Sequence, residues 1–327
     1  MNQPKTSPKF DFAVGGQAVI EGVMMRSPNF NIVSVRNPSG DITKSSEFYQ
    51  NLIKRKTYLN IPLVRGVINM LEMMLIGTKA LNFSSRIALG DPSAPTDVAT
   101  NSQPTKSTAK ENLMLIFSLV FALGMSLFLF KFLPLWITDF VSQKFSLLQQ
   151  NYLVYNLLDG VLKTSFFVAY IAILSLLPDV KRVFKYHGAE HKSITTYEQG
   201  LPLTVENAKL QTRFHPRCGT SFILIVFLMS IFIFTAIPRN PDFLLNFAIR
   251  LAFLPLIAGI SYEFLKLTAK YSTHPLSKIV SWPGLMMQRL TTSEPDADML
   301  EVALNSLNSA IQAEQNFSKD QHERTVL

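Results

Sequence analysis

The chain has 327 residues, of which 48% are hydrophobic and only 17% are charged, and its formal net charge is +8. A soluble protein of this length would carry more charge, so the composition argues against a soluble class and favours a membrane protein. The positive charge requires no nucleic-acid partner, because no basic–aromatic motif for binding one is present. The only cysteine is Cys218, which excludes an internal disulfide.

Residues 1–89 predict a small α+β region on the cytoplasmic side. GGQAVIEGVMMRS and FNIVSVRNPSGDITKSSEFY consist of short β-prone runs broken by turns, and NPSGD is typical of a hairpin turn. The apolar stretch that follows carries a charged residue at every seventh position, namely Arg65, Glu72, Lys79 and Arg86. That spacing places a polar stripe on one helical face and predicts an amphipathic helix lying on the membrane or on other helices.

Residues 90–111 are rich in Ser, Thr and Pro and predict a flexible linker. Residues 112–270 then contain four runs that approach the 20 apolar residues a membrane span needs. These runs are Leu113–Ile137, Leu157–Leu177, Ser221–Ile237 and Leu244–Leu267. The sequence therefore predicts a mainly α-helical polytopic membrane protein with about four transmembrane helices.

Basic residues flank the predicted spans unevenly. Lys181, Arg182 and Lys185 follow the second run, and three lysines follow the fourth, whereas the connection between the first two runs contains only Lys144. Because cytoplasmic loops carry the excess of Lys and Arg, both termini and the loop at residues 179–220 are predicted to be cytoplasmic. This places the protein in the inner (plasma) membrane, with the lipid bilayer as its first partner.

Residues 271–315 predict a cytoplasmic helical segment, with Ser293 as the N-cap of a helix and Pro295 in its first turn. One apolar face is formed by Leu300, Ala303, Leu304, Leu307 and Ile311. Residues 316–327 predict a disordered tail. Within the second apolar run, Asp159 and Lys163 are four residues apart and predict an ion pair within one helix.

The stretch YHGAEHKSI contains the pattern His-x-x-Glu-His, with histidines at 187 and 191. On a helix, His187 and His191 lie one turn apart on the same face and could bind one Zn²⁺. Glu190 beside them could take the proton of a zinc-activated water. The alternative is a polar interfacial helix whose histidines only form hydrogen bonds, and Gly188 weakens the helix prediction by about 1 kcal/mol.

Further ligands are predicted from FHPRCGTSF, where His215 and Cys218 are close enough for one turn to direct both at a single ion. Glu263 falls near the cytoplasmic end of the fourth run, where a carboxylate is by default a functional candidate; the simpler reading is an ion pair with Lys266. Arg217 is a candidate for stabilising a developing oxyanion. We expect His215, Cys218 or Glu263 to complete the metal sphere.

Four motifs in order, GGQAVIEGVMMR, YHGAEHKSI, HPRCGTSF and PGLMMQRLTTSEPD, resemble the YqhQ family of bacterial membrane proteins. The resemblance covers most of the chain outside the linker. It implies a multi-span membrane protein of the kind described as a metal-dependent enzyme, with a metal centre at His187, Glu190 and His191. It implies no substrate.

The leading functional hypothesis is a membrane-embedded, metal-dependent hydrolase with its site at the cytoplasmic interface and a membrane-associated substrate. Zinc is the expected cofactor. The alternative is a non-catalytic membrane scaffold with a structural metal or with no metal. A closed site of His187, His191, His215 and Cys218 would indicate a structural metal, because catalytic zinc keeps one position open. A transporter is a third hypothesis, but Asp159, Lys163, Arg250 and Glu263 are few polar groups for a transport path.

Overall fold

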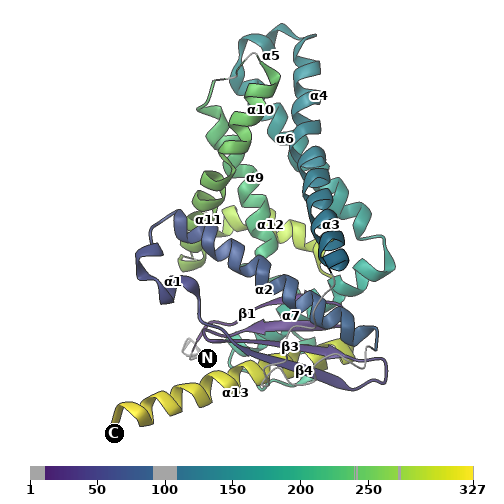
Figure 1. Cartoon of the computed structure of the whole chain (residues 1–327), viewed down its shortest axis with the longest axis vertical. Helices are drawn as coiled ribbons and strands as arrows, with labels where there is room; N and C mark the ends of the chain where they lie inside the picture. The colour runs from purple at the N-terminus through teal and green to yellow at the C-terminus, as the bar shows by residue number, and fades with distance from the viewer. Residues whose placement is uncertain (1–11, 91–108, 239, 241, 272–273, 327) are drawn as a thin grey trace, which may run out of the picture.

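The computed structural model describes residues 12–90, 109–238, 240, 242–271 and 274–326. The molecule has two parts, a base that contains a β-sheet and a tall bundle of helices above it (Figure 1). Most of the predicted linker at 90–111 lies outside the described residues. The fold is mainly helical with a small N-terminal antiparallel sheet, as predicted.

The sheet is an antiparallel meander in the order β1-β2-β3-β4. Its strands are β1 (Gly15–Val19), β2 (Gly22–Arg26), β3 (Phe30–Arg36) and β4 (Ile42–Phe48). The NPSGD stretch forms the β3–β4 turn, where Asn37 Oδ1 accepts a hydrogen bond of 2.9 Å from the Asp41 N–H and Gly40 has φ of +97°. The β1–β2 turn contains Glu21, whose carboxylate accepts a hydrogen bond of 2.6 Å from Arg182.

Both faces of the sheet are covered, because alternate residues of each strand point to opposite sides. Met25 and Ile32 face α7 (Pro178–Glu198) and α13 (Ala297–Val326) in one apolar core. Met24 and Val33 face α2 (Val64–Ala88) on the other side. This double burial explains why the three consecutive residues Val23, Met24 and Met25 of β2 are all apolar. The predicted amphipathic helix is α2, which packs on both the sheet and α11 (Leu254–Lys270).

The bundle rises and returns twice (Figure 1). In the first hairpin the ascending helix consists of α3 (Ala109–Leu127), the π-helix η2 (Phe128–Phe132) and α4 (Leu133–Ser142). The short helix α5 (Ser146–Gln150) lies at the top, and α6 (Tyr152–Leu174) descends from it. The second hairpin consists of α9 (Gly219–Thr235), α10 (Phe243–Ala252) and α11. The short segments α1 (Leu52–Arg55), η1 (Thr57–Leu59) and α8 (Val205–Lys209) and the longer α12 (Pro275–Thr291) belong to the base and its junction with the bundle.

Among the described residues, two helical segments are long and apolar enough to cross a membrane, Val120–Ser142 and Tyr152–Leu174. A third span is present if α10 and α11, bent by 40° at their junction, count as one. The expectation of four clear spans is therefore not met. The third predicted run forms α9, whose 17 residues are about 26 Å long, less than the hydrocarbon core of about 30 Å. The fourth run is divided, because Pro255 in the first turn of α11 separates that helix from α10.

A buried polar network joins the helices of the bundle. Asp159 of α6 forms ion pairs with Lys163 on the next turn and with Arg250 of α10, the latter at 2.5 Å. A third cation, Lys131 of η2, lies 4.8 Å from the centroid of the Phe234 ring. The predicted Asp159–Lys163 pair is therefore present, but its carboxylate also links α6 to α10.

Two predictions about the C-terminal segment are wrong. The helix begins at Ala297 and not after Ser293, because residue 293 is held against α7: its N–H donates to Phe184 O at 2.9 Å. Where a disordered tail was expected at 316–327, α13 continues to Val326. The predicted apolar face of this helix is present, since Leu300, Leu304 and Leu307 are buried against the sheet and α7.

Candidate metal centre

The helix predicted for His-x-x-Glu-His is α7, and it presents His187, Glu190 and His191 on one face at helical spacing. Gly188 within it is required by packing, because a Cβ there would lie 2.1 Å from Ser293 O. The helix therefore tolerates a residue of low helix propensity because the segment after α12 crosses it at that point. The rings of His187 and His191 are 4.4 Å apart between centroids.

Backbone carbonyls fix the orientation of both rings. His187 Nδ1 lies 2.8 Å from Thr291 O, and His191 Nδ1 lies 2.6 Å from Arg213 O. A carbonyl oxygen can only accept, so each Nδ1 carries the proton and each Nε2 presents a lone pair. This is the arrangement by which proteins orient metal-binding histidines, through a carbonyl or carboxylate behind the ring.

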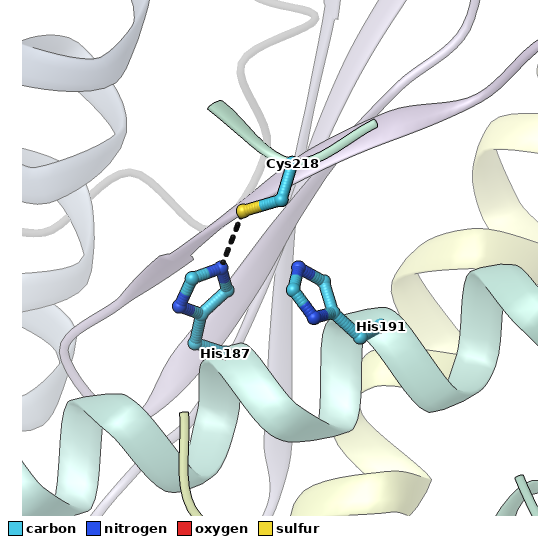
Figure 2. Close-up of side chains that lie close together, drawn as sticks. All are labelled: His187, His191 and Cys218. Carbon is cyan, nitrogen blue, oxygen red and sulfur yellow. Dashed lines mark hydrogen bonds between the residues drawn. The ribbon is translucent and has the colours of Figure 1, made fainter. Parts of the chain in front are cut away.

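Cys218 stands opposite the two rings, at the start of α9 (Figure 2). Its Sγ is 3.2 Å from His187 Nε2, and the ligand atoms of His187, His191 and Cys218 all lie within 4.8 Å of one another. We call these three residues the trio. The measured nitrogen–sulfur distance is close to the separation of about 3.5 Å expected for two ligands on one tetrahedral zinc.

The donor set of the trio fits a cation better than it fits hydrogen bonds alone. His191 Nε2 is buried and has no partner in hydrogen-bond geometry among the described residues. Burial lowers the pKa of His191 below its ordinary value, against an opposing effect of the nearby Cys218. Two Nε2 lone pairs face a thiol with one proton, so hydrogen bonding satisfies at most one of them at a time. Two neutral imidazoles and a thiolate are a ligand set that zinc prefers.

Glu190 is buried between α7 and the sheet. A Cβ on Gly16 of β1 would lie 2.9 Å from the Cγ and Oε1 atoms of Glu190, so only glycine at that position lets the carboxylate lie against the strand. Burial raises the pKa of Glu190, with His187 and His215 acting in the opposite direction. The glycine-rich stretch of β1 thus forms the floor beneath this carboxylate.

A pocket of about 520 Å³ opens beside the trio. Glu190, His191, His215, Arg217 and Cys218 contribute to its wall, together with residues of β1, β2 and α1. His187 is not part of the wall. The pocket is large enough for a substrate group to reach two members of the trio and the candidate base together.

His215 and Arg217 are engaged with a common carboxylate. His215 Nε2 lies 3.3 Å from Glu198 Oε2, and Arg217 forms an ion pair with the same side chain. The His215 backbone is clamped by Gln288, whose amide accepts from its N–H at 2.8 Å and donates to its C=O at 2.7 Å. His215 therefore lies beside the trio, with ring centroids of His191 and His215 5.7 Å apart, but is not a member of it.

Glu263 is the one predicted ligand that the fold takes elsewhere. Its carboxylate accepts from Arg65 Nε at 2.6 Å and forms an ion pair that joins α11 to α2. It lines neither the pocket nor the trio. The predicted ligand is thus corrected to an ion-pair residue, and its partner is Arg65, not Lys266.

Sequence reasoning missed the residues that act through their backbone. Thr291 and Arg213 orient the histidines by their carbonyl oxygens, which any residue could supply, so no side-chain pattern marks them. Gln288 of α12 is fully buried, but its burial has no signature in the surrounding sequence. Gly16 was visible within the GGQAVIEG stretch, but its role depends on the contact with Glu190.

Comparison with known proteins identifies the family of the chain. The family described as "Protein of unknown function (DUF1385)" matches residues 61–313, which include the whole trio. The chain belongs to this family. It is also similar to a Bacillus subtilis (strain 168) protein named "Uncharacterized protein YqhQ", with 37% identity over 308 residues that cover 92% of this chain and 93% of that protein. No solved structure matches the chain.

The DUF1385 match begins at residue 61, within the segment that leads into α2, and so leaves out the four-stranded sheet. The similarity to the Bacillus subtilis protein covers 92% of the chain and therefore extends into the residues before position 61.

Proposed function

We propose that the protein is a membrane-associated, metal-dependent hydrolase whose trio holds a divalent cation, zinc being the best fit. The observation that carries the proposal is the common direction of the two Nε2 lone pairs, each set by a carbonyl acceptor behind its ring. Three donor atoms face one another with a single exchangeable proton among them. A cation would satisfy all three at once.

The side chains around the trio support hydrolysis. A zinc ion held there would polarise a substrate oxygen and make water more acidic. Glu190, on the same face of α7 and on the pocket wall, would take the proton of the attacking water and return it to the leaving group. Arg217 on that wall would stabilise developing negative charge, with Glu198 holding its guanidinium in place.

The main alternative is a scaffold in which a metal only holds the α7–α9 connection together. Such a site would be closed by a fourth protein ligand, for which His215 is the nearest candidate. Its Nε2 faces Glu198 and its Nδ1 accepts from the Arg217 N–H at 3.4 Å. Within the described residues only three ligands converge, which favours a catalytic site with an open position on the pocket side.

We further propose that the bundle lies in the bacterial plasma membrane with the base in the cytoplasm. Because the bundle rises and returns twice, α2 and α13 lie together at the base (Figure 1). Lys181, Arg182 and Lys185 at the start of α7 flank the same end of the bundle, as expected of a cytoplasmic face. Fluorescence of a C-terminal fusion to a protein that folds only in the cytoplasm would test this orientation.

The first experiment is metal content of detergent-purified protein by mass spectrometry. We expect near-stoichiometric zinc in the wild type, loss of zinc in the His187→Ala/His191→Ala double variant, and full retention in Glu190→Gln. Retention in Glu190→Gln is expected because that residue acts as a base and not as a ligand. Equal, negligible metal in all three folded proteins would reject the metalloenzyme.

Replacement of zinc by Co²⁺ separates the catalytic site from the structural one. A site with an open position should change its visible spectrum when azide is added, whereas a closed four-ligand site should not. Cys218→Ser should remove the thiolate absorption, and His215→Ala should leave it in place. Loss of cobalt from His215→Ala would instead support the closed scaffold site.

A further inference from the structure

An apolar groove lies next to the pocket, between α2, α9 and α11. It has a volume of about 700 Å³, and its wall includes Met70, Met73, Leu81, Phe222, Ile223 and Leu265. We call it the α2–α9–α11 groove. The metal chemistry proposed above does not need a space of this size or an apolar wall. The groove is also partly open to the surroundings of the protein.

The groove and the pocket are adjacent. Both are lined by Met73 of α2 and by Gly219, the residue directly after Cys218. A Cβ placed on Gly219 would meet nothing within 4 Å, so the space beside Gly219 is open. A chain lying in the groove would therefore bring its end to the trio.

Helix α2 lines the groove and runs across the lower end of the bundle (Figure 1). Its outer face carries exposed apolar side chains, with Leu71, Met74 and Leu75 each more than half exposed. A helix with this pattern lies in the membrane interface, with its apolar face in the acyl-chain region. An apolar chain could thus enter the groove sideways from the bilayer.

The pocket at the other end of this path is cationic. Arg26, Lys54 and Arg217 contribute to its wall, while Glu190 is the one carboxylate there. Arg217 is balanced by Glu198, whereas the Arg26 guanidinium stacks on Tyr49, 4.7 Å from the ring centroid. The excess of positive charge suits an anionic group on the molecule whose chain fills the groove.

We propose that the groove and the pocket together bind an anionic phospholipid, with an acyl chain between α2, α9 and α11 and the headgroup end beside the trio. This inference rests on the proposed function, because it names the substrate class of that hydrolase. The apolar groove beside a polar pocket favours an amphiphile. The exposed face of α2 favours one that comes from the membrane, and the pocket charge favours an anionic headgroup.

The test uses the full-length protein reconstituted in phosphatidylcholine vesicles that contain a minor share of phosphatidylglycerol with a photoreactive acyl chain. We expect crosslinks at residues 70–82 of α2 and 219–223 of α9, and weaker labelling by phosphatidylcholine with the same photoreactive chain. Crosslinks spread evenly over the bundle, or equal labelling by the two lipids, would overturn the inference.

Two variants of α9 provide a matched comparison. Ile223 lies in the groove and Leu228 outside it, and both are 40% exposed. We expect Ile223→Trp to fill the groove and reduce labelling several-fold, and Leu228→Trp to leave it unchanged. Lys54→Gln should reduce the preference for phosphatidylglycerol while labelling by phosphatidylcholine stays the same.

The same experiment on the His187→Ala/His191→Ala variant separates the two proposals. The groove needs no metal, so labelling should persist in that variant. Groove labelling of wild-type protein that contains no zinc would support lipid binding while rejecting the hydrolase. Stoichiometric zinc without groove labelling would overturn lipid binding and leave the metal site intact.

Discussion

Gly188→Ala tests how the segment after α12 supports the proposed metal centre. In an ordinary helix interior this change would stabilise the protein by about 1 kcal/mol. Here the new Cβ would lie 2.1 Å from Ser293 O, where ordinary contact begins at 3.4 Å, so the segment would have to retreat by more than 1 Å. Overpacking of this kind costs about 1–3 kcal/mol.

The retreat would also weaken the hydrogen bond from the Ser293 N–H to Phe184 O, which contributes about 1 kcal/mol. The expected net loss is about 1–3 kcal/mol, which lowers the melting temperature by several degrees. Because Thr291 lies in the same stretch and orients His187, the zinc affinity of the proposed site should fall about 10–100-fold.

The assays are the apparent melting temperature in detergent and zinc affinity by competition with a chelator. Gly124→Ala in α3 is the control, because its Cβ would meet nothing within 4 Å, and we expect no loss of either quantity. A melting temperature at or above the wild-type value for Gly188→Ala, with unchanged zinc affinity, would refute the account of how this segment orients the site.

Three further predictions concern ion pairs and the core. Burial alone would raise the pKa of Glu198, but its hydrogen bond with His215 and its ion pair with Arg217 hold that pKa below the ordinary value. Glu198→Gln should therefore lower the free energy of unfolding by about 1 kcal/mol at pH 7. The stability that the carboxylate contributes is lost as pH falls, so the melting temperatures of the variant and the wild type should converge below about pH 4. Asp159→Asn leaves Lys163 and Arg250 as buried cations without their carboxylate. The free energy of unfolding, followed by thermal melting, should therefore fall by about 3–5 kcal/mol. A loss of less than about 1 kcal/mol would mean that water reaches the network and solvates the two cations. Leu300→Ala empties a fully buried site between α13 and the sheet and should cost about 2–5 kcal/mol, measured by thermal unfolding at fixed zinc concentration.

The parts of the site that could be predicted are those that one helix or one turn determines. The i, i+4 spacing of His187 and His191 is enough to place both on one face of α7. Cys218 was predicted because its turn is short and directly precedes an apolar run. These relations are local, so they need no knowledge of how the helices pack.

The wrong predictions depend on contacts between distant segments. Glu263 was expected near the metal, but its direction around α11 is decided by Arg65, 198 residues earlier in the chain. Ser293 has the composition of an N-cap, yet its N–H and C=O are both held against α7. Neither relation has a signature in the surrounding sequence.

The number of membrane spans was also overestimated from the sequence. Hydropathy located all four apolar runs, but it does not give the point at which a helix ends. The third run forms a helix of 17 residues and the fourth is interrupted between Ala252 and Leu254. Composition therefore predicted the bundle and overestimated the number of clear spans.

The cover of the sheet by α13 has a consequence for how the sheet and the helices depend on one another. Met25 and Ile32 share one buried core with Tyr186 and Ala189 of α7 and with Leu300 and Leu307 of α13. Removal of α13 would therefore expose apolar residues of the strands and of α7 together. Because these segments lie far apart in the sequence, the core between them forms only when both the strands and α13 are in place, and a chain without α13 would expose a sticky apolar surface.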